Sequence, residues 1–168
     1  CGLLDIAYKP QLAERQTEFA MLNAWPSELI TQLSSEQASE VAGIPLKHGG
    51  LFMPNAGWIC PPELVKQLFN AAEKTGRLRI NTQSKITNIS QVAQEKWQLT
   101  GSNIEQTFDV LVVCGGADSI KLNIINELPL TSVRGQISTV QTTQQLKNLS
   151  TVICHKGYLT PAHHNQHC

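Results

Sequence analysis

The segment Asp109-Val-Leu-Val-Val-Cys-Gly-Gly-Ala-Asp-Ser119 is the most informative part of this 168-residue sequence. Its apolar run over 110–113 has no polar break, which predicts a strand buried on both faces, as in a parallel sheet between helices. The run ends in Cys114-Gly115-Gly116, where side chains are small or absent. At the carboxyl end of a parallel strand, such residues let a ligand lie against the main chain. An ordinary buried strand that ends in a glycine turn is the alternative interpretation.

Composition and charge limit the class of protein. The 13 Lys and Arg residues balance the 13 Asp and Glu residues, so no excess of positive charge marks a nucleic-acid-binding protein. No apolar run approaches the roughly 20 residues needed to cross a bilayer, and no secretory signal is visible. The 5 cysteines are scattered without a Cys-x-x-Cys pair. This pattern argues against a disulfide scaffold or a four-thiolate zinc site and predicts reduced thiols in a cytoplasmic protein.

Helix and strand signals surround the opening segment. Pro61-Pro62-Glu63 begins a predicted helix that stops at Gly76, and Ser34 and Gly43 bound a shorter one. A helix is also predicted over 10–24, with helical turns over 28–33. Strands are predicted over 2–7, 50–53, 77–81, 85–90, 132–141 and 151–154, with a hairpin over 97–107. This order predicts an α/β nucleotide-binding domain with a small antiparallel insertion.

Five motifs together resemble the family of D-amino-acid oxidases and glycine oxidases. They are Gly49-Gly-Leu-Phe52, Gly57-Trp-Ile-Cys-Pro-Pro-Glu-Leu64, the segment 109–117, Leu128-Pro-Leu-x-x-Val-Arg-Gly-Gln136 and Gly157-Tyr-Leu-Thr-Pro161. Each motif alone is weak, but their order and spacing are specific, and the resemblance covers nearly the whole chain. The second and the last motif favour the branch of the family that modifies tRNA.

The resemblance implies a mixed α/β fold. The chain is interpreted as the central fragment of an FAD/NAD(P)-binding-like domain interwoven with a β-rich substrate domain. Residues 50–117 are expected mainly in the FAD part, and residues 1–49 and 118–168 mainly in the substrate part. Because the Gly-x-Gly-x-x-Gly fingerprint of the family is missing from the sequence, the chain alone is expected to lack bound FAD and to be inactive.

The resemblance also implies an FAD-dependent oxidoreductase that acts on a C–H bond beside an amine nitrogen. In the tRNA-modifying branch, the implied reaction removes the carboxymethyl group from 5-carboxymethylaminomethyl-(2-thio)uridine at the wobble position, which leaves the aminomethyl form. A methyltransferase activity that uses S-adenosylmethionine is implied for a separate domain of the full-length protein. Two alternatives stay open: a flavoenzyme for small free amines such as glycine, and a folded core without catalysis.

The resemblance assigns four residues to the cofactor. The main chain at Ile86 is expected near the adenine end of FAD, and the turn of Cys114, Gly115 and Gly116 is expected to pass close to the cofactor. A plain core residue is the alternative for Ile86. Cys114 is interpreted as a small buried residue rather than a redox thiol.

Three residues are candidates for substrate binding. Arg134 offers a two-point hydrogen bond to a carboxylate or phosphate, with a structural salt bridge as the alternative. Gln136 lies on the same face of its predicted strand. Tyr158 matches a tyrosine near the substrate in related oxidases, with a packing role as the alternative. Many amino-acid oxidases carry an arginine after the proline of the last motif, where this chain has Ala162. No catalytic residue is identified.

Histidines and cysteines gather near the end of the sequence. His163 and His167 lie four positions apart, with Cys154 and Cys168 nearby. The segment follows a proline and has no helical pattern that would place two histidines on one face, so we predict no metal site.

Overall fold

The chain forms two compact units in the computed structural model, which describes residues 1–23, 25–125 and 127–168. The first unit combines Cys1–Val65 with Ile137–Cys168, and the second unit comprises Lys66–Gln136.

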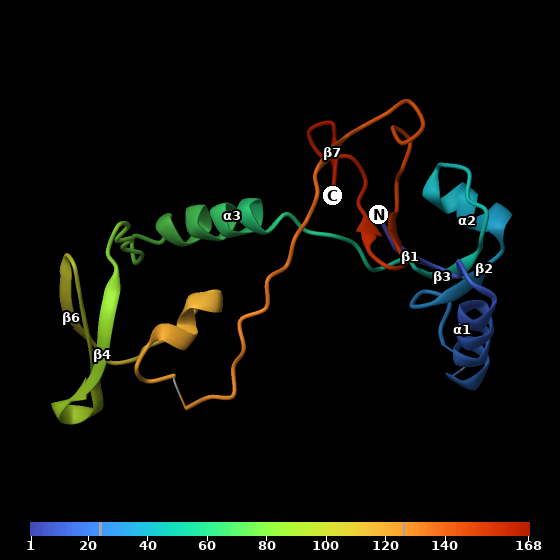
Figure 1. The fold of residues 1–168 in the computed structure, drawn as a ribbon. Coiled ribbons are helices and arrows are strands. Elements are labelled where there is room, and N and C mark those ends of the chain that lie inside the picture. The colour runs from blue at the N-terminus through green and yellow to red at the C-terminus, as the bar shows by residue number, and fades with distance from the viewer. Residues whose placement is uncertain (24, 126) are drawn as a thin grey trace. The chain divides into compact units, whose positions relative to one another are not determined.

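The first unit is built on a five-stranded sheet in the order β2-β3-β1-β8-β9. Its strands are β1 (Leu3–Ile6), β2 (Thr31–Leu33), β3 (Gly50–Met53), β8 (Val152–Cys154) and β9 (Tyr158–Leu159). The central strand β1 pairs antiparallel with β3 and parallel with β8, so that Leu4 lies opposite Ile153. The two distant parts of the sequence are therefore joined at the middle of one sheet (Figure 1).

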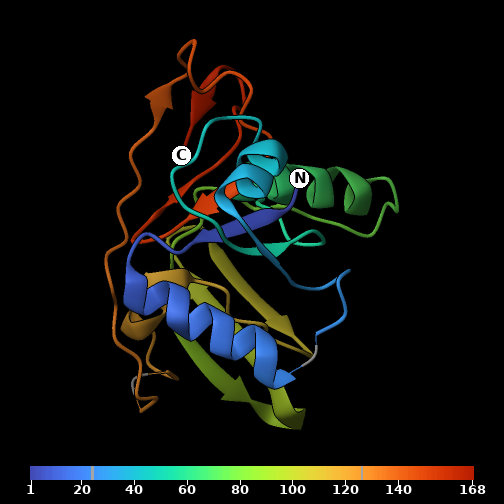
Figure 2. The same ribbon diagram turned by 90° about the vertical axis from the view of Figure 1, so that its right-hand side faces the viewer.

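Helices α1 (Pro10–Asn23) and α2 (Ser35–Ala42) contact this sheet (Figure 2). Helix α2 has the predicted ends: Ser34 and Gln37 form a capping box, and Gly43 closes the helix in the left-handed conformation at φ 72°. Two alanines of this helix, Ala38 and Ala42, are buried where it packs against the rest of the unit. The core of the unit comprises Leu4, Ile6, Ala38, Ala42, Leu149 and Ile153.

Helix α3 (Pro61–Glu73) begins in the first unit and continues into the second. Its proline start confirms the predicted helix, and Gly76 follows at φ 68°. None of its residues is buried in the described chain, although Leu64, Val65, Leu68 and Phe69 form an apolar face. Near the other end of the sequence, β7 (Val140–Gln141) pairs antiparallel with β10 (Gln166–His167).

The second unit contains a three-stranded antiparallel sheet in the order β4-β5-β6. Its elements are β4 (Ile86–Val92), the short helix η1 (Ala93–Glu95), β5 (Lys96–Gly101), β6 (Ile104–Phe108) and the short helix η2 (Gly116–Lys121). The predicted hairpin is confirmed as β5 and β6. Asn123 covers the free edge of β4, because its side chain accepts from the N–H of Ile89 at 3.2 Å and donates to the Ile89 carbonyl at 2.7 Å.

The predicted buried strand over 110–113 is wrong. In the described chain this segment pairs with no strand, and Val110 and Val112 are 76% and 77% exposed. A strand buried on both faces needs neighbours, whereas the strands of the second unit pair only with one another. An apolar run alone is therefore not enough to predict a buried strand.

Three other predicted elements are corrected. Residues 77–81 form no strand, and the predicted strand over 132–141 is reduced to Val140–Gln141. Ile80 and Ile137 are 51% and 63% exposed, because no described strand lies beside them. The end of the predicted helical turns over 28–33 is instead strand β2. The predicted end of the first helix at Ala24 lies outside the described residues.

Candidate functional site

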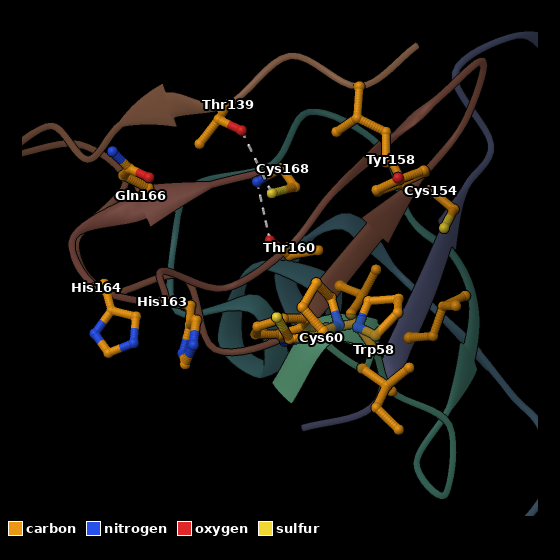
Figure 3. Close-up of a pocket in the computed structure, with 17 residues that line it drawn as sticks. Trp58, Cys60, Thr139, Cys154, Tyr158, Thr160, His163, His164, Gln166 and Cys168 are labelled. Carbon is orange, nitrogen blue, oxygen red and sulfur yellow. Dashed lines mark hydrogen bonds between the residues drawn. The ribbon is translucent and has the colours of Figure 1, made fainter. Parts of the chain in front are cut away.

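A cavity of about 660 Å³ lies in the first unit (Figure 3). Most of its wall is apolar, with hydroxyl, thiol and imidazole groups among the apolar side chains. Its lining includes Leu3, Trp58, Ile59, Cys60, Ile137, Thr139, Val152, Cys154, Tyr158, Thr160, His163, His164, Gln166 and Cys168. A concave apolar site with a few polar groups is the usual form of a small-molecule site.

Two segments far apart in the sequence build this wall. The first is segment 57–60, which leads into α3 at Pro61. The proline ring fixes the φ angle at the start of the helix. The opposite segment is a hairpin at the end of the chain, in which His163 and Gln166 exchange main-chain hydrogen bonds of 2.7 and 3.0 Å. His164 and Asn165 turn the hairpin at φ 50° and 61°, the positive values that a two-residue type I′ turn requires.

His167 is a structural residue in this hairpin. Its side chain is fully buried, and both ring nitrogens are in use. The Thr160 carbonyl can only accept, so Nδ1 donates to it at 2.8 Å, and in the neutral ring Nε2 accepts from the Thr142 hydroxyl at 2.8 Å. The spacing of His163 and His167 therefore does not place the two rings at one site.

His163 instead faces Glu63. His163 Nε2 donates to Glu63 Oε1 at 3.0 Å, and His164 Nε2 lies 3.4 Å from the same oxygen. The pKa of the Glu63 carboxyl lies below its usual range, mainly because of the hydrogen bond from His163. The indole of Trp58 meets the His163 ring edge to face at 5.5 Å. Trp58, His163 and His164 line the cavity, and Glu63 lies beside them.

One of the thiols in this wall is that of Cys154, at the end of β8. Burial raises the pKa of the Cys154 thiol, and the nearby Asp5 carboxylate adds to the effect. The group is therefore held as a thiol rather than a thiolate at neutral pH. Tyr158, from β9, lines the same cavity and is 51% exposed.

A second cavity, of about 500 Å³, lies in the second unit and brings together two of the predicted cofactor residues, Ile86 and Gly115. Its wall also contains Lys85, Asp118 and Lys121, and the last two form an ion pair of 2.5 Å. Cys114 and Gly116 are adjacent in sequence but do not line this cavity. Cys114 is exposed, so the prediction of a buried residue is wrong: the strand that would have covered it does not form.

Arg134 and Gln136 lie on an exposed extended segment of the second unit. The expected strand face that they would share is absent, because the segment pairs with no described strand. Among the described residues Arg134 has no ion-pair partner, so the structure gives no support to a structural salt bridge.

Comparison with known proteins gives a match along the whole chain. Residues 1–168 match the family described as "FAD dependent oxidoreductase". The chain belongs to this family. The predicted family is thereby confirmed, and with it FAD as the family's cofactor.

Curated relatives of this chain carry the name tRNA 5-methylaminomethyl-2-thiouridine biosynthesis bifunctional protein MnmC. The protein from Pseudoalteromonas atlantica is 37% identical over 99% of this chain, and the one from Aeromonas hydrophila is 36% identical over 100%. The chain spans only 26% and 25% of the length of these two relatives.

Solved structures similar to this chain include two glycine oxidases. The enzyme from Bacillus cereus has a TM-score of 0.80 at 22% identity, and the one from Geobacillus kaustophilus has 0.72 at 18%. Each comparison covers 99% of this chain, and 47% and 45% of the respective enzymes. With the helices and sheets described above, this likeness confirms the predicted mixed α/β fold class.

The lining of the second cavity combines main-chain and charged groups. A Cβ built on Gly115 would stand 2.9 Å from Ser119 Oγ, so a side chain at this position would crowd Ser119. The ammonium groups of Lys85 and Lys121 lie in the lining and favour an anion, although Asp118 pairs with Lys121. Ile86 and Gly115 share this lining, and their contact with the cofactor stays a prediction.

Sequence reasoning missed Trp58, Cys60 and Glu63 as part of the first cavity and its edge. Their motif was visible in the sequence, but only the fold brings it to the terminal hairpin. Among the described residues, no helix is long and apolar enough to cross a membrane.

Proposed function

We propose that this chain is part of an FAD-dependent oxidase that removes the carboxymethyl group from 5-carboxymethylaminomethyl-(2-thio)uridine in tRNA. The printed name of the relatives, which refers to biosynthesis of 5-methylaminomethyl-2-thiouridine in tRNA, supports the substrate. It supports tRNA modification more than oxidation of a free amine. Because these relatives are called bifunctional, the proposal includes methylation with S-adenosylmethionine on a separate domain, in a cytoplasmic protein.

In this proposal FAD supplies the two-electron oxidation of the C–H bond beside the amine nitrogen. Residues 50–117 belong mainly to the FAD part, and residues 1–49 and 118–168 mainly to the substrate part. Ile86 and Gly115 hold the cofactor through the second cavity, and Cys114 and Gly116 continue the same turn. Arg134 and Gln136, exposed on their extended segment, are available to a phosphate or carboxylate of the substrate.

The observation that carries the substrate proposal is the apolar cavity of the first unit. Its Trp58 indole gives a surface on which a nucleobase can stack, and the Tyr158 hydroxyl can orient a polar group. Apolar walls exclude water and favour an uncharged amine. Ala162 stands where many amino-acid oxidases hold the carboxylate with an arginine, so the carboxylate of either candidate substrate lacks that contact here.

The test uses the full-length protein loaded with FAD and tRNA that carries the carboxymethylaminomethyl group. Nucleoside mass spectrometry should show the aminomethyl product, with release of one glyoxylate for each group removed. Trp58→Ala should lower kcat/KM by roughly 5- to 150-fold, since stacking of a base on an aromatic ring is worth about 1–3 kcal/mol. Trp25→Ala, which removes an indole outside the cavity lining, should change kcat/KM little. Oxidation of glycine as fast as or faster than that of tRNA would remove the proposal.

A further inference from the structure

Three metal-binding side chains meet at the edge of the first cavity. The ligand atoms of Cys60, Glu63 and His163 all lie within 4.8 Å of one another. Cys60 and Glu63 come from the start of α3, whereas His163 comes from the hairpin, 100 residues beyond Glu63 in sequence. No local sequence pattern explains this meeting, so the fold itself assembles the cluster.

The spacing of the three donors suits one metal ion. Around a tetrahedral zinc ion, with bonds of about 2.3 Å to sulfur and about 2.0–2.2 Å to nitrogen or oxygen, neighbouring donors stand roughly 3.3–3.8 Å apart. His163 Nε2 and Glu63 Oε1 are 3.0 Å apart, and no pair in the cluster exceeds 4.8 Å. Small changes of side-chain rotamer therefore bring all three to ligating distance.

A further imidazole, that of His164, stands beside the cluster, outside the group that shares the 4.8 Å limit. His164 Nε2 lies 3.4 Å from Glu63 Oε1, and the His164 ring packs on the His163 ring at 4.1 Å. His164 occupies a turn position with φ 50°, which is more often taken by Gly, Asn or Asp. The turn thus holds an imidazole next to the carboxylate at some conformational cost.

We propose that Cys60, Glu63 and His163 bind a zinc ion, with His164 as the fourth ligand. Thiolate, imidazole and carboxylate in a four-coordinate set are the donors typical of zinc. The expectation of no metal rested on the pair His163 and His167, but the ring of His167 is committed to Thr160 and Thr142.

A simple hydrogen bond between carboxylate and imidazole would explain Glu63 and His163 without a metal. That hydrogen bond does not involve the Cys60 thiol, whereas a zinc ion would take the Cys60 sulfur as a ligand. Cys60, His163 and His164 line the cavity, so the ion would join its two wall segments and hold them together. The inference is independent of the proposed oxidase function.

The experiment uses the full chain, reduced and stripped of metal with a chelator. Calorimetric titration should show one Zn²⁺ bound per chain. Co²⁺ should give the absorption bands of a four-coordinate site together with a thiolate-to-metal charge-transfer band. Zn²⁺ at about 100 times its Kd should raise the Tm by on the order of 5–10 °C, because it binds only the folded chain.

Variants identify the ligands. Cys60→Ser should remove the charge-transfer band. His163→Ala and Glu63→Gln should each weaken Zn²⁺ binding by more than the roughly 10- to 100-fold loss seen when a group that only supports a ligand is removed. The Glu63 side chain is 52% exposed, so Glu63→Gln keeps the test independent of folding. Cys1→Ser and His48→Ala, which change a thiol and an imidazole outside the cluster, should bind Zn²⁺ as the unmodified chain does.

Three results would overturn the proposal. They are a Co²⁺ spectrum without a sulfur band, a zinc affinity unchanged by Glu63→Gln, and a loss of affinity in the two control variants as large as in the ligand variants.

Discussion

Replacement of Gly50 by alanine should strongly destabilise the first unit. Gly50 opens β3, which lies between β1 and β2 in the sheet. A Cβ at this position would stand 2.1 Å from the carbonyl oxygen of Asp5 and 3.0 Å from the Cα of Ile6. Both atoms belong to the main chain of the central strand, so the conflict cannot be relieved by a rotamer change.

The expected loss of stability in Gly50→Ala can be estimated from the displacement of β3 away from β1. Overpacking of a well-packed interior costs about 1–3 kcal/mol. Separation of β3 from β1 at this point also weakens a pair of ladder hydrogen bonds, each worth about 1 kcal/mol. We therefore expect the free energy of unfolding to fall by about 3–5 kcal/mol, a large part of the roughly 5–15 kcal/mol typical of a domain.

Urea unfolding followed by circular dichroism gives the total effect, and amide hydrogen exchange over residues 3–6 and 50–53 locates it. Gly157→Ala is the matched control, because Gly157 is exposed and a Cβ there meets no atom within 4 Å. Its free energy of unfolding should stay within about 0.5 kcal/mol of the unmodified chain. A loss below about 1 kcal/mol for Gly50→Ala, or equal losses for both variants, would refute the close approach of β3 to β1.

Three further predictions concern local contacts. Ser34→Ala removes the cap of α2 and should lower the free energy of unfolding by about 0.5–2 kcal/mol in a urea titration; no change would contradict the capping role. Cys154 should be alkylated more slowly than the exposed Cys1 at neutral pH, because burial raises the pKa of the Cys154 thiol. Its alkylation rate should still rise with pH above about 8.5, the approximate pKa of an ordinary thiol. Equal alkylation rates for the two cysteines from neutral pH to above about pH 8.5 would count against the raised pKa. Asn123→Ala should speed amide exchange at Ile89, since both side-chain hydrogen bonds to its main chain are lost at a cost of about 1–3 kcal/mol, and unchanged exchange would exclude that role.

Several of the elements that the sequence predicted correctly have local signals. Ser34 and Gly43 mark the ends of α2 because side-chain and backbone preferences act within one turn. The proline at the start of α3 acts in the same way. The hairpin of β5 and β6 needs only a short turn between apolar alternations.

Most of the errors concern the pairing partners of a segment, although strand β2 stands where helical turns were predicted. The apolar run over 110–113 forms no strand, because a strand needs hydrogen-bonded neighbours, which the described chain does not supply. The same holds for most of 132–141. The expected placement of Tyr158 near the substrate stays a prediction; the structure adds that it lines a cavity.

The polar edge of the cavity shows a further limit of sequence spacing. Residues four apart share a face on a helix but not in a two-residue hairpin, where His163 faces Gln166 and His167 turns into the interior. The partners of His163 lie about 100 residues earlier. No period within the sequence connects them.

The pairing of β1 with β8 has a consequence during protein synthesis. Leu4 and Ile153 are partners across the sheet, so about 150 residues must be translated before this side of β1 can be covered. At roughly 5–20 residues per second, the ribosome needs about 8–30 s for that length. Throughout this interval the apolar strand has an open edge on which another nascent chain can add a strand. Chaperone capture of the emerging polypeptide, or slow codons after the β3 region, would thus change the yield of native protein more than for a domain whose neighbouring strands are consecutive.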